Sequence, residues 1–460
     1  MRRFILLLCL LGVWTVQAQP SLRLKKSILL KESHAWNLKQ MGLWQGGFAG
    51  SCYEEFFMWD KKGQVLRKCK APLMVLNDRR NDSLVRWSYK SKMPLFAFTK
   101  DLAVKTLEFC FIMDTTLTTR LTARYMSKGE EFGPDYKGKY SLFAEQGGRA
   151  SGSRLLVPLR PDALCPARYD TVKPQNDAEL RARLRRELLD HCLVDSDLPL
   201  FAFVPYKLPP YDTVPEHNFI REGLAYDHFI GKQDPAFASY AAEGKYVLSM
   251  PEWWANQWPF DYDTTRQMVY VNQNITPNIY QYDTSGRLLN TFGEPGRHLT
   301  AAERELKFMT PTLADTFVEW VMADMTALGF EQKQRSANWN VEPCLKWVSR
   351  EYLEILYDER HNRIFRLYRK PMPGLTVKKA KPFFGNQVAL LDSPYGKRPT
   401  YLQIYDMNAG GKLIYDEQLY HQNIHLMGVD ENNVLWGSAF AKDGEYFSGP
   451  VKVLQFQIKE

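Results

Sequence analysis

The segment from Tyr282 to Thr300 reads YDTSGRLLNTFGEPGRHLT and contains the pattern that decides the fold. An alternating apolar run ends at Asp283, a Thr-Ser-Gly turn follows, and a second alternating run leads to Gly293. An Asp at a strand end accepts hydrogen bonds from turn amides, and Gly supplies the positive φ of a tight turn. The segment therefore predicts a β-hairpin followed by a glycine-rich exit.

The same order of aromatic residue, Asp, turn and second strand recurs along the chain. Alternation with a period of two residues buries one face of each strand. The other copies are YEEFFMWDKKGQVLRK (Tyr53–Lys68), YLEILYDERHNRIFRLYR (Tyr352–Arg369) and YLQIYDMNAGGKLIYD (Tyr401–Asp416), and a related turn and strand occur in GVDENNVLWGSAF (Gly428–Phe440). The hairpin is therefore a repeat unit.

The spacing of these units indicates the architecture. Repeats of roughly 40–50 residues are typical of four-stranded propeller blades. The interval from Asp358 to Asp406 fits one such blade, and a longer loop would account for the larger interval that separates Asp283 from Asp358. The last strand, VKVLQFQI (Val451–Ile458), would pair with the early strand SLRLKKSILL (Ser21–Leu30) and close the ring, which removes exposed sheet edges. We therefore expect an all-β propeller that occupies residues 19–460 as a single domain.

Two helical insertions interrupt the strands. Residues 176–195 place Leu180, Leu184, Leu188 and Leu189 on one face of a helix, and the opposite, arginine-rich face is expected to be solvated. Residues 300–329 are also expected to be helical, because Thr300 and Glu303 have the spacing of a capping box. Pro311 divides this second segment.

Two of these stretches resemble known repeats. YDTSGRLLNTFGEPG is similar to an NHL-type repeat, in which a strand ending in Asp leads through a Gly turn to a Phe-Gly exit. YLEILYDERHNRIFRLYRKPMP resembles a segment of secreted TolB-like six-bladed propeller proteins of Bacteroidetes. The resemblance covers about Tyr262–Phe440 and is weaker around Tyr53–Lys68. It implies six blades, a location in the bacterial envelope, and a role in binding or scaffolding.

The N-terminal segment, from Met1 to Ala18, has the features of a secretory signal peptide. Arg2 and Arg3 precede the short apolar run FILLLCLLGVW (Phe4–Trp14), and Val16-Gln17-Ala18 provides a cleavage site. The alternatives are a buried N-terminal strand and lipidation at Cys9. Residues 19–460 contain no long uncharged apolar stretch, so no transmembrane segment is expected there. We expect export to the periplasm, the outer membrane or the extracellular space.

The charge balance argues against a nucleic-acid partner. The chain has 60 basic and 52 acidic residues, and two of the basic ones lie in the signal peptide. The remaining excess is expected to be spread along the chain, without the basic stripe of a nucleic-acid site. Six cysteines follow the signal peptide, and the pairs Cys52–Cys69 and Cys165–Cys192 are the disulfides to test, with free buried thiols as the alternative.

The sequence identifies no catalytic residue, cofactor or metal site. The GxSxG, HExxH, P-loop and EF-hand motifs are absent, as are the repeated Asp boxes of sialidase-like propellers. His421 and His425 have the spacing of a helical metal pair, but in a strand they would lie about 13 Å apart. In DYDT (Asp261–Thr264), capping of a strand end is favoured over calcium binding.

The ligand-binding candidates are aromatic and basic residues on loops. PEWWANQWPF (Pro251–Phe260) places Trp253, Trp254 and Trp258 in a proline-bounded loop, where they either contact a ligand or pack between blades. Arg297 and His298 follow the glycine exit and would face a central channel, or else belong to an ordinary loop.

Two hypotheses of function follow. The first is a non-enzymatic envelope propeller that binds a glycan, a peptide or a partner protein. The second is a propeller-fold glycan lyase or hydrolase with its site at the channel mouth. A cluster of polar residues with perturbed titration would favour the enzyme.

If Trp254 contacts a ligand, Trp254→Ala will abolish saccharide binding and leave the melting temperature nearly unchanged. If Trp254 packs between blades, the same substitution will cost about 3–5 kcal/mol of unfolding free energy. Thermal denaturation and a glycan-binding assay on the same preparation distinguish the two roles, and a large loss of stability would contradict the binding surface.

Overall fold

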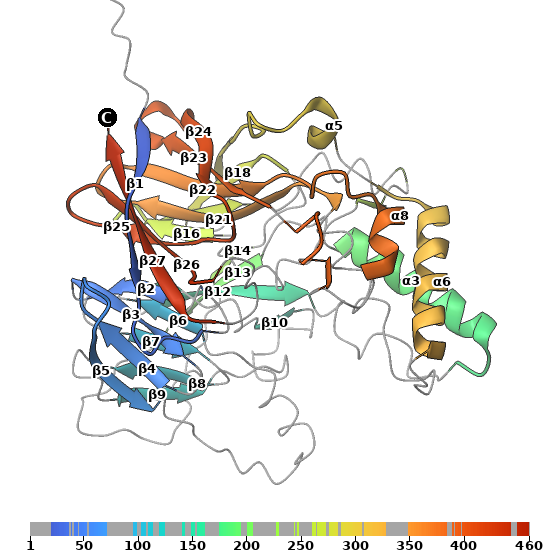
Figure 1. Cartoon of the computed structure of the whole chain (residues 1–460), viewed down its shortest axis with the longest axis horizontal. Coiled ribbons are helices and arrows are strands. Elements are labelled where there is room, and N and C mark those ends of the chain that lie inside the picture. The colour runs from blue at the N-terminus through green and yellow to red at the C-terminus, as the bar shows by residue number, and fades with distance from the viewer. Residues whose placement is uncertain are drawn as a thin grey trace, which may run out of the picture.

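The hairpins predicted from the sequence are present in a computed structural model of the chain (Figure 1). They are β4 (Glu55–Trp59) with β5 (Val65–Lys70), β18 (Ile279–Asp283) with β19 (Leu288–Phe292), β21 (Glu351–Asp358) with β22 (Arg363–Arg369), β23 (Thr400–Asp406) with β24 (Lys412–Tyr420), and β25 (His425–Val429) with β26 (Val434–Phe440). The structure describes residues 20–35, 38, 41–44, 46–52, 55–70, 95–98, 103–106, 109–113, 119–124, 140–142, 149–151, 154–161, 174–194, 200–205, 227–229, 243, 246–247, 260–263, 265–272, 276–283, 287–305, 308–327, 348–383, 389–390, 392–396, 398–442 and 449–459.

The turn chemistry of these hairpins is also as predicted. In each hairpin, the Oδ1 atom of the Asp at the turn accepts a hydrogen bond from a turn amide at 2.8–3.3 Å; the residues are Asp60, Asp283, Asp358, Asp406 and Asp430. These bonds satisfy backbone donors that the strand ladder leaves unpaired. The Asp therefore fixes where each first strand ends.

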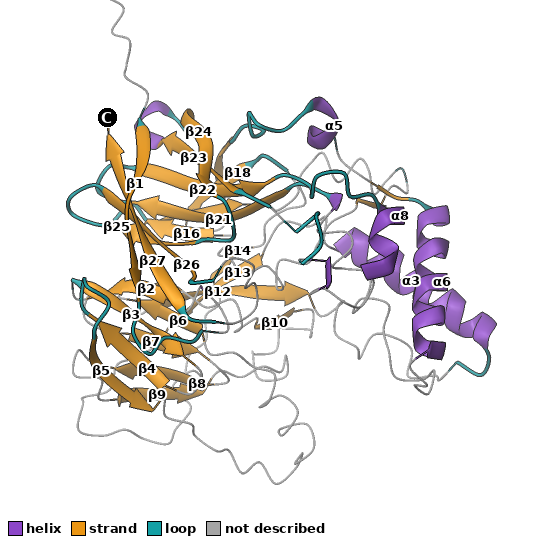
Figure 2. Ribbon diagram, in the orientation of Figure 1, coloured by secondary structure: helices purple, strands orange, loops and turns teal. Residues whose placement is uncertain are grey.

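The strands form antiparallel sheets of four neighbouring strands, which we number along the chain (Figure 2). The first sheet has β2 (Met41–Trp44), β3 (Gly47–Cys52), β4 and β5; the second has β6 (Leu95–Phe98), β7 (Ala103–Thr106), β8 (Phe109–Met113) and β9 (Thr119–Arg124). The third has β10 (Tyr140–Leu142), β12 (Arg154–Pro161), β13 (Leu200–Pro205) and β14 (Asp227–Phe229), with β11 (Arg149–Ser151) also paired to β12. The fourth has β16 (Phe260–Asp263), β17 (Met268–Asn272), β18 and β19; the fifth has β21, β22, β23 and β24; and the sixth has β25, β26, β27 (Val451–Lys459) and β1 (Ser21–Leu29). The described part of the chain is thus mainly β-sheet.

Contacts between sheets involve mostly their first strands. Strand β2 contacts β6 of the second sheet and β25 of the sixth, and β6 contacts β11 of the third. Strand β21 contacts β16 and β17 of the fourth sheet on one side and β25 on the other. These contacts place the first sheet next to the second and the sixth, the second next to the third, and the fifth next to the fourth and the sixth.

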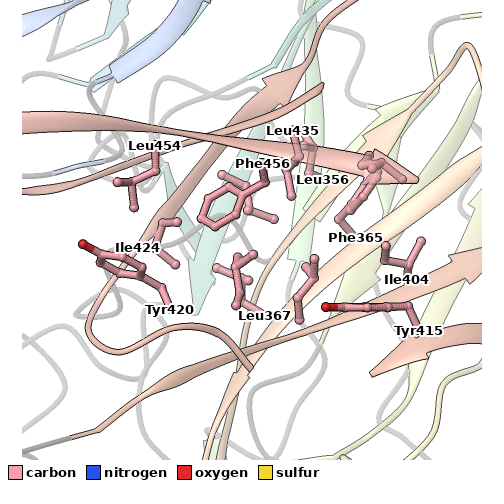
Figure 3. Close-up of a cluster of buried hydrophobic side chains, with 14 of the residues drawn as sticks. Leu356, Phe365, Leu367, Ile404, Tyr415, Tyr420, Ile424, Leu435, Leu454 and Phe456 are labelled. Carbon is pink, nitrogen blue, oxygen red and sulfur yellow. The ribbon is translucent and has the colours of Figure 1, made fainter. Parts of the chain in front are cut away.

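The fifth sheet is buried on both faces, and the two faces differ in chemistry. Phe365 and Leu367 of β22 point to an apolar cluster that continues to Leu454 and Phe456 of the sixth sheet (Figure 3). Arg366, by contrast, alternates with them and points to the opposite face, which is polar and aromatic. Because each large apolar side chain contributes about 1.5–3 kcal/mol on burial, the apolar face joins the two sheets firmly.

The helices form a unit with its own hydrophobic core. Helices α3 (Asp177–Val194), α6 (Pro311–Ala327) and α8 (Val377–Ala380) contribute to it, and Leu184 and Phe317 are both fully buried there. The arginine face of α3 reaches solvent, as expected, and two of its arginines also pair with α6: Arg181 lies 2.8 Å from Glu319 and Arg185 lies 2.7 Å from Asp315. These pairs are exposed and contribute little energy individually, so packing of the leucine face is the main contribution.

The segment from 300 to 329 differs in part from the expected continuous helical region. Thr300 and Glu303 form the predicted capping box of the short helix α5 (Ala301–Arg304). A strand, β20 (Phe308–Met309), then pairs with β15 (Tyr246–Val247) before α6 begins at Pro311. A proline is suited to the first helical position because its missing N–H has no partner there in any case. No helix in the described ranges is both long and apolar enough to cross a bilayer.

The first and last strands of the chain pair with each other, as the sequence predicts. Strand β1 runs antiparallel to β27 from Ser21 opposite Lys459 to Leu29 opposite Lys452. Ile28 of β1 is 5% exposed and joins the core between the first and sixth sheets, whereas its neighbour Leu29 is 57% exposed. The early strand is therefore an integral part of the sixth sheet.

If this pairing anchors the early strand, Ile28→Ala will lower the free energy of unfolding by about 3 kcal/mol, because it leaves a cavity in a packed core. Leu29→Ala is the matched control and will change it by no more than about 0.5 kcal/mol. Chemical denaturation of both variants measures the difference, and equal stabilities would contradict the burial of this strand.

Candidate functional site

The glycine-rich exit of β19 crosses the polar face of the fifth sheet. The amide of Glu294 donates to the Tyr405 hydroxyl at 3.1 Å, and its carbonyl accepts from Arg366 Nη2 at 2.8 Å. Further along, the Arg297 amide donates to Asp416 Oδ2 at 2.8 Å. Three strands of the fifth sheet, β22, β23 and β24, thus hold the exit backbone, which fixes the position of Arg297 and His298.

The glycines of the exit allow this close approach. Gly293 has a φ of +114°, and a Cβ added there would lie 2.1 Å from the Pro277 carbonyl oxygen. A Cβ on Gly296 would lie 2.3 Å from the ring of Tyr368. Both distances are shorter than any normal van der Waals contact, so a larger residue at either position would push the exit away from the sheet.

Arg366 is the central residue of the polar face. Its side chain is 0% exposed, and its guanidinium lies over the rings of Tyr352 at 4.6 Å and Tyr405 at 5.2 Å. It donates to the Gln403 side chain, to the Tyr405 hydroxyl at 2.5 Å, and to the carbonyls of Glu294 and Pro277. Gln403 in turn donates to Asp416 Oδ2 at 2.9 Å, which connects the buried positive charge to a buried carboxylate.

His298 lies at the exposed end of this network. Its ring stacks on Tyr401 with centroids 4.9 Å apart, and Tyr401 stacks on Tyr368 at 5.1 Å. His298 Nε2 lies 3.1 Å from Glu417 Oε2, and the two side chains are 37% and 57% exposed. We call Arg297, His298, Tyr401 and Glu417 the His298 site. It combines a fixed aromatic stack with a cation, an imidazole and a carboxylate that reach solvent.

The tyrosines beneath the site stay protonated. Burial, with the charge of Asp416 as the next cause, raises the pKa of Tyr368, whose hydroxyl donates to Asp416 Oδ1 at 2.8 Å. Burial and then the charge of Glu303 raise the pKa of Tyr401, and burial raises the pKa of Tyr405 to about 12. At neutral pH these hydroxyls are therefore hydrogen-bond donors and not phenolate nucleophiles or bases.

The carboxylates near the first strands of the fifth and sixth sheets are occupied by other protein groups. Glu354 Oε2 lies 2.5 Å from His425 Nδ1, and the Leu426 amide donates to the other carboxylate oxygen. Glu351 pairs with Arg398 at 2.8 Å, and burial lowers the pKa of that guanidinium. All four charged or titratable side chains are less than 9% exposed, so they are not placed to contact a ligand.

Sequence reasoning missed these pairs. The available signal was an isolated Glu in the otherwise apolar strand YLEILYD and a histidine that opens a buried strand. His425 is buried against Glu354, whereas His421 is exposed and lies against the Tyr420 ring, so the two histidines of HQNIH face different surroundings. Within the described ranges, no cluster of three or more metal-ligating side chains occurs.

The capping role favoured for the DYDT segment is confirmed. Asp263 Oδ1 accepts from the amides of Thr265 at 3.0 Å and Arg266 at 2.9 Å. Asp261 Oδ2 accepts from the Tyr357 amide at 2.7 Å, which joins the fourth sheet to the fifth. Both aspartates thus accept hydrogen bonds from backbone amides.

The structure tests the expected Cys52–Cys69 disulfide but does not describe the tryptophan loop. Cys52 has a free thiol, so the Cys52–Cys69 disulfide is absent, and burial raises the pKa of this thiol to about 12, which makes it unreactive. Trp253, Trp254 and Trp258 lie outside the described residues, as does Cys165.

No protein-family model and no curated protein matches the chain. Among solved structures, it is similar to a member of the DUF4221 family from Bacteroides vulgatus, with a TM-score of 0.47, 10% identity, and coverage of 96% of this chain and 99% of that one. A Bacteroides fragilis protein provisionally described as exported has a TM-score of 0.39 and 9% identity, with 97% of each chain covered. BamB from Moraxella catarrhalis has a TM-score of 0.32 and 11% identity, with 95% and 100% covered. All three TM-scores are below one half, so these likenesses identify neither the fold nor the function.

Arg366→Lys tests the buried network. Lysine keeps the charge but cannot reproduce the planar fork that reaches a side-chain amide, a hydroxyl and two carbonyls, so the free energy of unfolding will fall by about 3 kcal/mol. Arg287→Lys on the neighbouring hairpin is the control, because that side chain is 75% exposed and its loss will cost at most about 0.5 kcal/mol. Equal melting curves for the two variants would show that the network does not hold the sheet.

Proposed function

We propose that the chain is a six-bladed β-propeller of the cell envelope that binds a saccharide without catalysing a reaction. Six successive sheets, each with a path of four strands, support the six blades. The contacts of β2, β6, β21 and β25 with strands of neighbouring sheets support an arrangement in which first strands surround a common axis. The resemblance to NHL-type and TolB-like repeats favours the same architecture.

The pairing of β1 with β27 supports closure of the ring. It places the earliest strand beside three strands from the end of the chain in one sheet. A second link, between Ala35 and Gly449, continues the association of the two ends beyond the strands. A ring of sheets closes when one blade takes strands from both ends of the chain.

Export is proposed from the segment Met1 to Ala18. The Arg-Arg start, the short apolar run and the Val-Gln-Ala site support a cleaved leader, and the mature chain would begin at Gln19. Strand β1 begins at Ser21, so cleavage at this site leaves the whole strand intact.

The His298 site is the observation that carries the proposed binding function. Its imidazole is stacked on Tyr401 and yet 37% exposed, so the ring keeps accessible surface on which a sugar can pack. Arg297 is exposed and Glu417 is 57% exposed, and both can form hydrogen bonds with sugar hydroxyls. The backbone of the site is held by the fifth sheet, so little conformational entropy is lost on binding.

The occupied carboxylates favour binding over catalysis. A glycan hydrolase or lyase needs an acid and a base within reach of the substrate. Glu351 and Glu354 are instead buried against Arg398 and His425, the buried Tyr368 stays protonated, and the exposed Glu417 lies against His298. We propose Trp253, Trp254 and Trp258 as a further contact surface for the same ligand.

Screening on a glycan array, followed by titration calorimetry with the best saccharide, tests this proposal. His298→Ala will weaken binding about fivefold, because a stacked ring contributes on the order of 1 kcal/mol. His361→Ala is the matched control: this histidine is 33% exposed and lies 2.8 Å from Asp358, and its loss will leave affinity unchanged.

Two results would contradict the proposal. One is the absence of saccharide binding by the unaltered protein across the array. The other is turnover of a bound glycan, detected as new reducing ends or unsaturated products, which would favour a lyase or hydrolase.

A further inference from the structure

The outer strands of the first and sixth sheets meet to form one edge of the molecule. Strand β1 is the outermost strand of the sixth sheet, and β5 is the outermost strand of the first. The Lys31 amide donates to the Gly63 carbonyl at 2.9 Å, and Lys68 pairs with Glu32 at 3.0 Å. Both strands lie on the left of the view in Figure 1. We call residues 20–35 and 55–70 the basic edge.

The basic edge holds the whole charge excess of the chain after the leader. It contains nine basic residues and three acidic ones, a net charge of +6. The full chain has a net charge of +8, of which Arg2 and Arg3 contribute two, so the remainder of residues 19–460 is electrically balanced. The expectation that the excess is spread along the chain is therefore wrong: two segments, separated in sequence by residues 36–54, hold it at one edge of the fold.

The charges of the edge reach solvent, and most of its acids are engaged by the protein. Eight of the basic side chains are exposed: Arg23, Lys25, Lys26, Lys31, Lys61, Lys62, Arg67 and Lys68. Of the acids, Glu32 pairs with Lys68, and Asp60 accepts the turn amides of Lys62 and Gln64. A concentration of one sign of charge at a surface attracts a partner of the opposite sign.

Exposed leucines accompany these charges. Leu24 is 44% exposed, Leu29 is 57% exposed and Leu66 is 58% exposed. They are three of the five large apolar side chains that are exposed within the described ranges. The aromatic residues of the same edge, Phe56, Phe57 and Trp59, are no more than 2% exposed, so they provide no platform on which nucleic-acid bases could stack.

We propose that the basic edge docks on the surface of a bilayer that contains anionic lipids. Lysines near such a surface each add to the attraction, and apolar side chains between them enter the interface between headgroups and acyl chains. An acidic protein or a nucleic acid would use the charges but would have less use for the exposed leucines. This surface is separate from the His298 site, since it is built from other sheets.

Vesicle co-sedimentation tests the docking. The probe is phosphatidylcholine vesicles with and without about 30% phosphatidylglycerol, mixed with protein recovered after export whose N-terminus has been sequenced. The protein will bind the anionic vesicles at low salt, will bind neutral vesicles at least about tenfold more weakly, and will be released as the Debye length falls to about 3 Å near 1 M salt.

Charge-reversal variants locate the contact. Lys25→Glu/Lys26→Glu on β1 and Lys61→Glu/Lys62→Glu on the β4–β5 turn will each weaken vesicle binding by about tenfold or more. Lys378→Glu/Lys379→Glu on α8 is the control, because it makes the same charge change at two exposed lysines outside the basic edge. Leu29→Ser/Leu66→Ser will also weaken binding, although it removes no charge.

Several outcomes would overturn the proposal. They are equal binding to neutral and anionic vesicles, equal losses for the basic-edge and α8 variants, and unchanged binding in the leucine variant. Tighter binding to a DNA oligonucleotide or an acidic protein than to vesicles would assign the edge to that partner instead. Melting temperatures of the two lysine variants, one on strand β1 and one on the β4–β5 turn, will show whether either loss reflects unfolding.

Discussion

The guanidinium of Arg366 has no access to solvent, and a charge moved out of water costs several kcal/mol unless the protein replaces its hydration. Here the replacement comes from different parts of the chain: a side-chain amide and a hydroxyl on β23, the carbonyls before and after the β18–β19 hairpin, and two tyrosine faces. Because each partner must be in place at once, the requirement fixes the distance between the fourth and fifth sheets. The position of the His298 site depends on that spacing, since its backbone belongs to the same exit segment.

The two faces of the fifth sheet stabilise its contacts with neighbouring sheets in different ways. The apolar face, with Phe365 and Leu367, supplies non-directional stabilisation that tolerates small shifts. The polar face supplies directional bonds that allow one register only. A junction built from both is strong and also specific, so the loop that carries the His298 site takes its shape from the sheet below it.

Most of what the sequence could predict was local; the pairing of β1 with β27 is the exception, because it follows from the need to close a ring of sheets. Each hairpin turn depends on an Asp and the next four residues, and the same holds for the capping box of Thr300, so patterns within a few residues were sufficient. The Glu354–His425 pair and the network of Arg366 join segments far apart in sequence, and their signals are single charged residues that look ordinary until the partner is known. The ion pairs between α3 and α6 were missed for the same reason: the sequence does not show which helix lies beside these exposed arginines.

The pairing of β1 with β27 has a consequence for the order of folding. These strands come from opposite ends of the chain, so their association closes a very long loop, and such contacts form late and slowly. During synthesis, β1 emerges first and must remain without its partner until almost every other strand has been made. Through that interval its edge is open to pairing with another chain, and its lysines then act as gatekeepers, because like charges keep two such edges apart.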